Sequence, residues 1–386
     1  MSKKICGIAT MSGTVEAFML GNLNYMAEHG YEAYCMSQND ANVDKIHFGN
    51  VKYIPHKSMT WGMVGPITFF KNVRDFYKVF KKEKFDIIQY ATFNAALSAS
   101  IAGWLARVPV RINLQWGMSY ASRTGFQHYF RRTVDKIICL CSTSVQPDSR
   151  SNYNYAVADH LYPARKGCVI YNGSACGVNF NRFDINKRAE WRAQVFEKYG
   201  LTKYKRIFGY VGRLIVEKGI NELMEAFEKL NDPESCLIFV GRTDRTETLN
   251  QELLERIKSL PNVIFTGSVK NPEVYYAAFD FMILPSYQEG FGMTVLETAA
   301  MGTPPICTNI KGPTDFVKND VTGLVCEVKS VDSLYNTLMK ACQMNEEEYQ
   351  HLAQTSYNTV KRDFDSETFK QKFYENREEL LNSVKK

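Results

Sequence analysis

The sequence has no apolar run long enough to cross a lipid bilayer as a helix. Its least polar stretch, residues 94–108, is shorter than the roughly 20 residues that a membrane-spanning helix needs, and it contains Arg107. We therefore expect a buried helix there. Proline and glycine are moderate, at 12 and 24 of 386 residues, which excludes collagen-like and low-complexity classes. With 45% hydrophobic and 23% charged residues, the composition is that of a packed globular protein.

Disulfide and metal patterns are also missing. The ten cysteines are scattered from Cys6 to Cys342 with no signal peptide before them, so we expect reduced thiols in the cytoplasm. The six histidines show no pairing at metal-ligand spacing, and the single D-x-D sequence, 363–365, lies away from any predicted strand end. We expect no metal and no other cofactor.

Charge is distributed unevenly along the chain. Residues 1–182 carry 21 Lys and Arg against 11 Asp and Glu, a formal charge of +10, whereas the rest carries 26 against 30, or −4. A basic first half indicates an anionic partner, which could be a membrane surface, a phosphorylated substrate or nucleic acid. The predicted helix 71–84 has apolar residues on one side and lysines around them, so it could lie on an anionic bilayer or dock with a solvated basic edge.

Short apolar runs rich in β-forming residues alternate with helical stretches, which is typical of α/β folds with parallel sheets. The first set of predicted strands comprises 4–9, 31–36, 52–54, 86–91, 109–114, 136–142 and 168–171. The second set comprises 206–211, 236–240, 262–265, 281–284, 305–308 and 324–328. Runs that are apolar at consecutive positions indicate strands covered on both faces. We predict two Rossmann-like domains, 1–182 and 183–365, and a C-terminal helix, 366–386, that reaches back to the first domain.

The strongest local signal is segment 285–297, PSYQEGFGMTVLE, directly after a predicted strand. In an open α/β sheet, ligands bind at this end of the strands. Gly290 and Gly292 allow backbone N–H groups to approach a ligand, and the helix that follows directs its N-terminal dipole there. Glu289 and Glu297 offer carboxylates that can accept hydrogen bonds from sugar or ribose hydroxyls.

Both carboxylates also have a simpler interpretation. Thr294 and Glu297 have the spacing of a capping box, in which the glutamate caps its own helix. Glu289 lies in a predicted loop and could be a solvated surface carboxylate. The sequence leaves these alternatives open.

The second signal is segment 209–219, GYVGRLIVEKG, at the end of the first strand of the second domain. Arg213 and Lys218 flank a loop that opens a helix, so two cations and a helix dipole converge on a place suited to a diphosphate. The alternative is an ordinary basic loop with Glu217 as a local partner. The segment matches neither the dinucleotide-binding fingerprint nor the Walker A sequence.

Together these motifs resemble those of the retaining GT-B glycosyltransferases of family 4. The resemblance rests on Gly212-Arg213, Glu217-Lys218-Gly219, the pair Glu289 and Glu297 enclosing Gly290-Phe291-Gly292, Ala300-Met301-Gly302-Thr303-Pro304, and Gly312-Pro313-Thr314-Asp315. It covers residues 204–365 and is looser over the first domain. The fold it implies is two Rossmann-like domains whose parallel sheets face each other across a cleft.

The resemblance implies a donor site for a nucleoside diphosphate sugar in the second domain. Arg213 and Lys218 would hold the diphosphate and stabilise it as it leaves. Glu297 would bind the ribose, while Glu289 and the backbone of 290–292 would hold the sugar hydroxyls. The implied donor-binding set further includes Gly13, Gly212, Ser268, Val269, Gly290, Phe291 and Gly292. Catalysis in this family retains the anomeric configuration and needs no side-chain nucleophile, so the implied catalytic residues are Arg213, Lys218 and Glu289.

The first domain departs from the family pattern at the expected acceptor site. The loop after its first strand has Gly13 without a paired glycine, and the stretch after the fourth strand, 90–94, has no histidine. A later His-Gly is replaced by Gln115-Trp116-Gly117. Asn94, Gln115 and Trp116 are candidate acceptor contacts, and packing at strand ends is the alternative for each.

The resemblance and the charge together predict a hexosyltransferase of surface glycan synthesis. We expect it to move a hexose or N-acetylhexosamine from a UDP-linked donor to a lipid-linked or polysaccharide acceptor, bound peripherally at the inner face of the membrane. One alternative is a UDP-sugar isomerase of GT-B fold, which would need acid and base side chains in the cleft. The other alternative is a nucleic-acid-binding protein. The sequence has no helix-turn-helix, zinc or RNP signature, so we expect no nucleic acid partner.

Overall fold

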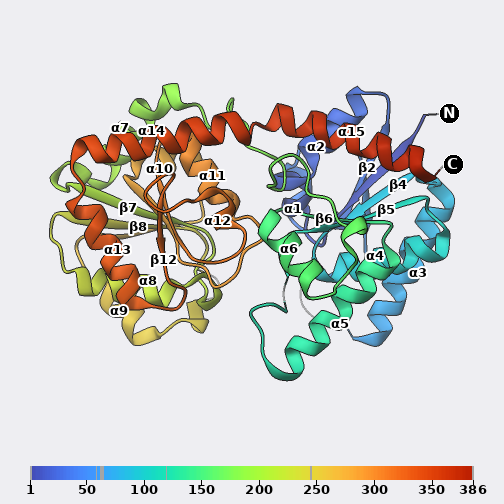
Figure 1. Cartoon of the computed structure of the whole chain (residues 1–386), viewed down its shortest axis with the longest axis horizontal. Coiled ribbons are helices and arrows are strands. Elements are labelled where there is room, and N and C mark those ends of the chain that lie inside the picture. Colours follow the sequence, from blue (N-terminus) through green and yellow to red (C-terminus); the bar gives the residue numbers. More distant parts are fainter. Residues whose placement is uncertain (1, 58, 61–64, 119, 244–245, 385–386) are drawn as a thin grey trace. The chain divides into compact units, whose positions relative to one another are not determined.

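The computed structural model describes residues 2–57, 59–60, 65–118, 120–243 and 246–384 (Figure 1). It divides into two compact units. The first comprises Met1–Gly177 with Ser366–Lys386, and the second is Val178–Asp365. The predicted domain boundary, after residue 182, falls a few residues beyond this division. The predicted terminal helix belongs to the first unit, and its last two residues, 385–386, lie outside the described part.

The first unit is built on one six-stranded parallel sheet with the strand order β3-β2-β1-β4-β5-β6. Its strands are β1 Lys4–Ile8, β2 Glu32–Gln38, β3 Lys52–His56, β4 Ile87–Tyr90, β5 Val110–Gln115 and β6 Ser144–Pro147. In the register, Ile8 pairs with Met36 on one side and with Tyr90 on the other. The central strands β1, from Ile5 on, and β4 are buried, as expected for a sheet covered on both faces.

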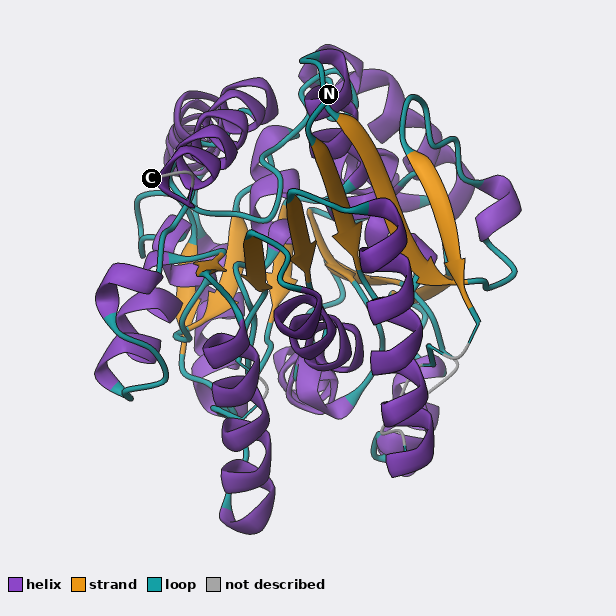
Figure 2. Cartoon of the chain, turned by 90° about the vertical axis from the view of Figure 1, so that its right-hand side faces the viewer, coloured by secondary structure: helices purple, strands orange, loops and turns teal. Residues whose placement is uncertain are grey.

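Helices cover both faces of this sheet (Figure 2). They are α1 Ser12–Phe18, α2 Leu20–Glu28, α3 Pro66–Glu83, α4 Phe93–Ala106, α5 Gly125–Cys141, α6 Arg150–Ala158 and α15 Ser366–Val384. One core cluster joins the sheet to α1, α2 and α15, where Phe369 and Phe373 of α15 are buried. The other joins it to α3, α4 and α5 through Phe76, Phe80, Ala99 and neighbouring residues.

The second unit repeats this architecture with the strand order β12-β11-β10-β7-β8-β9. Its strands are β7 Arg206–Val211, β8 Ser235–Val240, β9 Val263–Gly267, β10 Phe281–Leu284, β11 Pro305–Thr308 and β12 Leu324–Cys326. Its helices are α7 Arg188–Tyr199, α8 Ile220–Leu230, α9 Gln251–Lys258, α10 Pro272–Ala278, α11 Met293–Ala300, α12 Pro313–Phe316, α13 Val331–Gln343 and α14 Glu346–Asp363. On α8 the buried residues Ile220, Leu223, Met224 and Phe227 recur at helical spacing, so this helix packs one face onto the sheet.

The predicted fold class, α/β with parallel sheets, is therefore what the chain adopts. Two predicted strands are wrong. Residues 136–142 form the end of α5, because Ile138 and Cys139 face the core while Ile137 and Leu140 are exposed on the other side of the helix. Residues 168–170 lie outside the sheet and are held to β6 by the Cys168 N–H, which donates to the Val145 carbonyl at 2.9 Å. Tyr171, with a φ of +52°, begins a turn.

The predicted buried helix at 94–108 is α4, half of whose residues are buried. Among the described residues, no helix combines the length and the apolar character that crossing a bilayer requires.

Candidate functional site

The order of strands in the second unit defines where a ligand would bind. On one side of β7 the sheet continues with β8 and then β9. On its other side it continues with β10, β11 and β12. The adjacent strands β7 and β10 thus form the topological switch point of the sheet, whose carboxyl edge is the ligand site of open α/β sheets. The loops that leave these two strands are 212–219 and 285–292, the two segments that the sequence singled out.

These two loops pack directly against each other. Gly219 has a φ of +68°, and a Cβ there would lie 1.9 Å from the Pro285 carbonyl oxygen. The Tyr287 N–H donates to the Glu217 carbonyl at 3.0 Å. A glycine at position 219 is therefore required both by the backbone conformation and by the close approach of the neighbouring loop.

The closest polar contact between the loops is an ion pair. The Lys218 Nζ lies 2.5 Å from the Glu289 Oε1, and the two side chains are only 22% and 13% exposed. The Ser286 hydroxyl, itself fully buried, donates to the same carboxylate oxygen at 2.7 Å. The structure thus brings together two of the three predicted catalytic residues, and Glu289 is not a solvated surface carboxylate.

Arg213 lies in the same loop as Lys218, and its side chain is exposed. Its carbonyl oxygen accepts a hydrogen bond from the Tyr210 hydroxyl at 2.8 Å. Burial raises the pKa of Tyr210, and the negative charge of Glu289 raises it further. Tyr210 is therefore a neutral donor that fixes the backbone from which Arg213 projects.

Glu297 lies on α11, which begins directly after Gly292. Its carboxylate accepts a hydrogen bond from the Tyr276 hydroxyl at 2.9 Å. Burial raises the pKa of Glu297, although this hydrogen bond lowers it. The capping-box alternative is wrong, because the N-cap residue is Gly292 and Thr294 lies inside the helix.

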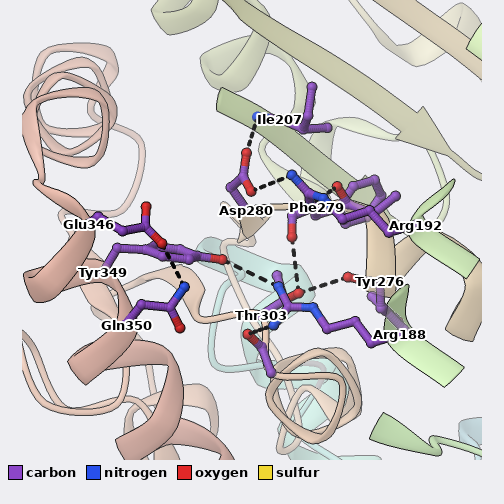
Figure 3. A network of polar contacts seen from close by, with 12 residues as sticks. Arg188, Arg192, Ile207, Tyr276, Phe279, Asp280, Thr303, Glu346, Tyr349 and Gln350 are labelled. Atoms are coloured by element: carbon purple, nitrogen blue, oxygen red, sulfur yellow. Dashed lines mark hydrogen bonds and ion pairs between the residues drawn. The ribbon is translucent and has the colours of Figure 1, made fainter. Parts of the chain in front are cut away.

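A polar network behind α10 fixes the position of Tyr276 (Figure 3). The buried Thr303 hydroxyl bonds the carbonyl oxygens of Tyr276 and Phe279 at 2.8 and 3.1 Å. Arg192 pairs with Asp280 at 2.9 Å, and that aspartate also accepts from the Ile207 N–H of β7 at 2.7 Å. The network thereby ties the end of α10 to the start of the central strand.

The loop 290–292 is held from a third side. A Cβ on Gly312, whose φ is +96°, would lie 1.9 Å from the Gly290 carbonyl oxygen. The Phe291 side chain is buried and contacts Phe364 with ring centroids 5.4 Å apart. The Phe291 ring therefore packs in the core, and only the backbone of Phe291 is available to bind a ligand.

The remaining donor residues of this unit lie along the same edge. Gly212 directly follows β7, and its N–H donates to the Val240 carbonyl at 2.9 Å. Ser268, which is exposed, and Val269, which is partly buried, follow the edge strand β9. From β10 to β9 the edge spans three strand spacings of about 4.8 Å, or about 14 Å, which is the length scale of an extended nucleotide sugar.

The first unit has its own switch point, between β1 and β4. Gly13 lies in the first turn of α1 after β1, with open space around the position of a Cβ. Asn94 lies in the first turn of α4 after β4 and donates to the Thr60 carbonyl at 3.0 Å. The Thr10 N–H donates to the Thr92 hydroxyl at 2.9 Å and so joins the two loops.

The other two acceptor candidates, Gln115 and Trp116, occupy different environments at the end of β5. Gln115 is 5% exposed and accepts from the Tyr162 hydroxyl at 3.1 Å, which favours the packing alternative. Trp116 is partly exposed, contacts Phe18 with ring centroids 5.4 Å apart, and lines a pocket with Gln146. The burial of Gln115 thus favours packing, whereas the role of Trp116 as an acceptor contact stays a prediction.

Three residues that support these sites were missed by reasoning from the sequence. Ser286 positions Glu289, and Tyr276 positions Glu297. Thr92 has a φ of +65°, which is rare for a β-branched residue and typical of functional loops. Ser286 lies inside the motif and could have been found there. Tyr276 is distant in sequence, so only the packing of α10 against α11 reveals it.

Comparison with known proteins agrees with this geometry. The family of glycosyl transferases group 1 matches residues 192–359, which contain both loops of the switch point. This part of the chain is therefore similar to a group 1 glycosyl transferase domain. The predicted resemblance to glycosyltransferases is confirmed, whereas retention of configuration stays a prediction.

Two relatives resemble the chain over most of its length. The capsular polysaccharide biosynthesis glycosyltransferase CapM of Staphylococcus aureus is 25% identical over 332 residues, which is 84% of each chain. The UDP-Gal:alpha-D-GlcNAc-diphosphoundecaprenol alpha-1,3-galactosyltransferase of Escherichia coli is 25% identical over 278 residues, which is 70% of each.

Among solved structures, a glycosyltransferase from Rickettsia africae ESF-5 superposes with a TM-score of 0.81 at 21% identity, covering 98% of this chain and 99% of that one. The chain has the GT-B fold, as predicted. The predicted cleft between its domains stays a prediction.

Proposed function

We propose that the protein is a retaining hexosyltransferase of surface glycan synthesis. It moves a hexose or N-acetylhexosamine from a nucleoside diphosphate sugar, with UDP as the nucleotide, to a lipid-linked or polysaccharide acceptor. The observation that carries the proposal is the Lys218–Glu289 pair at the switch point between β7 and β10. The E. coli relative, whose name specifies a UDP-sugar donor and a diphosphoundecaprenol acceptor, supports the choice of both substrates.

In the proposed reaction the bond between the sugar C1 and the diphosphate oxygen breaks, and the acceptor oxygen bonds to C1 on the same face. The acceptor proton passes to the leaving phosphate. Lys218 and Arg213 stabilise the negative charge that develops there, and one such fixed donor contributes about 3 kcal/mol, or a factor of about 100 in rate. With this charge supplied by side chains, the proposal needs no metal ion.

The ion pair also suggests how the site responds to the donor. Before binding, Lys218 and Glu289 neutralise each other in a place with little access to water. When the diphosphate binds, Lys218 turns to it, and Glu289 becomes available to accept hydrogen bonds from the sugar hydroxyls while Ser286 keeps it in place. Diphosphate and sugar are thereby recognised together.

The proposed acceptor places the reaction at a membrane, and we propose its cytoplasmic face. All ten cysteines are free thiols in the described structure, which suits a reducing compartment.

The test is thermal unfolding with UDP, GDP or ADP at matched concentrations, each with and without EDTA. A ligand present at about 100 times its dissociation constant stabilises the folded protein by about 2.7 kcal/mol. We expect a shift with UDP that EDTA leaves unchanged. A shift only with GDP would contradict the proposed donor, and no shift with any nucleotide would contradict the donor site.

The variant Lys218→Met should abolish the UDP shift and lower the rate of UDP release from the donor about a hundredfold. The matched control is Lys205→Met, because Lys205 also forms a 2.5 Å ion pair, with Glu234, but on the surface, where its side chain is 73% exposed. The control should behave as the wild type. Equal UDP shifts in both variants would remove Lys218 from the proposed role.

A further inference from the structure

Exposed apolar side chains are concentrated on one part of the first unit. Among the described residues, ten of the twelve large hydrophobic side chains that are exposed lie on α3, α4 and α5. The most exposed of them are Ile67, Phe70, Trp104, Phe126, Tyr129 and Leu140, at 57% or more, and these six define the α3–α5 face. Single exposed hydrophobic residues are normal on a protein surface, but a concentration of this kind marks an interaction site.

The α5 helix shows most clearly that this exposure follows a pattern. Its buried residues Val134, Ile138 and Cys139 pack on the core. On the opposite side, Phe126, Tyr129, Phe130, Ile137 and Leu140 are exposed and recur at intervals of three, four and seven residues. The helix therefore has two apolar sides, of which the chain covers one. This second apolar side made the end of α5 resemble a buried strand in the sequence.

The three helices form a continuous layer. Helix α4 packs against both α3 and α5 and lies between them (Figure 1). Phe70 and Tyr77 of α3 together with Leu105 of α4 line a groove on the surface of this layer. The exposed apolar side chains of α3 and α4 thus belong to one surface.

The stretch of chain that contains these three helices carries most of the positive charge of the first domain. Residues 66–141 contain 12 Lys and Arg against 4 Asp and Glu, so +8 of the +10 in residues 1–182 lies here. On α3, Lys71 and Arg74 are exposed between Phe70 and Tyr77, and Lys78, directly after Tyr77, is exposed as well. Aromatic and aliphatic side chains alternating with cations are typical of helices that lie in the interface of an anionic bilayer.

We propose that the α3–α5 face docks on a lipid bilayer with anionic headgroups. Its apolar side chains enter the interface, and its cations contact the headgroups. A second copy of the chain is a poorer occupant, because a symmetric dimer would bring two positively charged faces together. The surface rests on the proposed function, since it holds the enzyme where a lipid-linked acceptor is found.

The experiment measures sedimentation of the full chain with vesicles of phosphatidylcholine, with and without phosphatidylglycerol, at low and high salt. We expect binding to the anionic vesicles that weakens as salt rises. The variant Phe126→Ser/Phe130→Ser should weaken binding at least about tenfold. The matched control is Val321→Ser, since Val321 is 52% exposed but belongs to the second unit, and it should bind as the wild type.

The cations are tested by Lys71→Gln/Lys78→Gln. One basic residue near an anionic surface changes the partition coefficient about fivefold, so we expect a loss of more than about tenfold for the pair. Wild-type protein that fails to bind anionic vesicles would overturn the proposal. So would binding that both double variants leave unchanged, or a dimer in solution that Phe126→Ser/Phe130→Ser dissociates.

The outcome is independent of the donor site. The UDP shift in thermal unfolding should be the same in these variants as in the wild type. Loss of vesicle binding with an intact UDP shift in the variants supports the surface. If the wild type binds vesicles but no nucleotide shifts its thermal unfolding, the proposed function is contradicted while the proposed membrane-docking surface is still supported.

Discussion

The contact between Gly312 and Gly290 allows a sharp test of the donor loop. An alanine Cβ at position 312 would lie 1.9 Å from the Gly290 carbonyl oxygen, whereas ordinary contacts begin at 3.4 Å. The loop 290–292 would have to move by about 1.5 Å, which is enough to misplace the backbone proposed to hold the donor sugar. Since a misplacement of about 1 Å can reduce a rate about a hundredfold, Gly312→Ala should lower UDP release from the donor by about that factor.

The control is Gly30→Ala. Gly30 has a φ of +90°, close to the +96° of Gly312, but nothing lies within 4 Å of the position of its Cβ. Both variants place an alanine at positive φ, which costs at least about 1–2 kcal/mol in urea unfolding. Gly312→Ala adds the clash, and also the strain of a ψ of −80°, which lies outside the left-handed helical region. Calorimetric binding of a UDP-hexose and the rate of UDP release should therefore be normal in Gly30→Ala. Equal binding and rates in the two variants would refute the role of the 290–292 backbone.

Three further predictions concern the contacts that hold the sites in place. Burial raises the pKa of Asp40, but the hydrogen bonds from Ser12 and the Asn42 N–H together bring it below its usual value. These bonds therefore stabilise the fold above about pH 4, and their contribution is lost as pH falls through the lowered pKa. Ser12→Ala should therefore cost about 1.5–3 kcal/mol in urea unfolding at pH 7, and the cost should shrink as pH falls through the lowered pKa; a cost that does not change with pH would contradict this. Tyr276→Phe removes a hydrogen bond from the Glu297 carboxylate, so it should raise the pKa of Glu297 further and weaken UDP binding about tenfold or more. Calorimetry measures this affinity, and an unchanged value would show that the Tyr276 hydroxyl does not position the carboxylate. Thr303→Val leaves two buried carbonyls without their donor and should lower the free energy of unfolding by about 1–3 kcal/mol, whereas an unchanged unfolding midpoint would count against the network.

Much of the fold follows from local patterns. The run Leu237–Val240 is apolar at consecutive positions, and the structure makes it the fully buried strand β8. Segments 209–219 and 285–297 combine glycines, charges and a helix start directly after a strand, so their place at the carboxyl edge of the sheet was predictable. The failure at 136–142 has the same origin, because a helix with two apolar sides has the composition of a covered strand.

The amino-acid sequence by itself therefore determined the alternation of strands and helices, the two α/β units and the identity of the donor motifs, because each depends on neighbours within one element. Tertiary structure decided which elements meet. The order of strands brought β7 beside β10, and only then did Lys218 reach Glu289 across 71 positions of sequence. The packing of α10 gave Glu297 the hydroxyl of Tyr276 as its partner. Contacts of this kind depend on long-range packing of buried side chains, which leaves no mark in the local pattern.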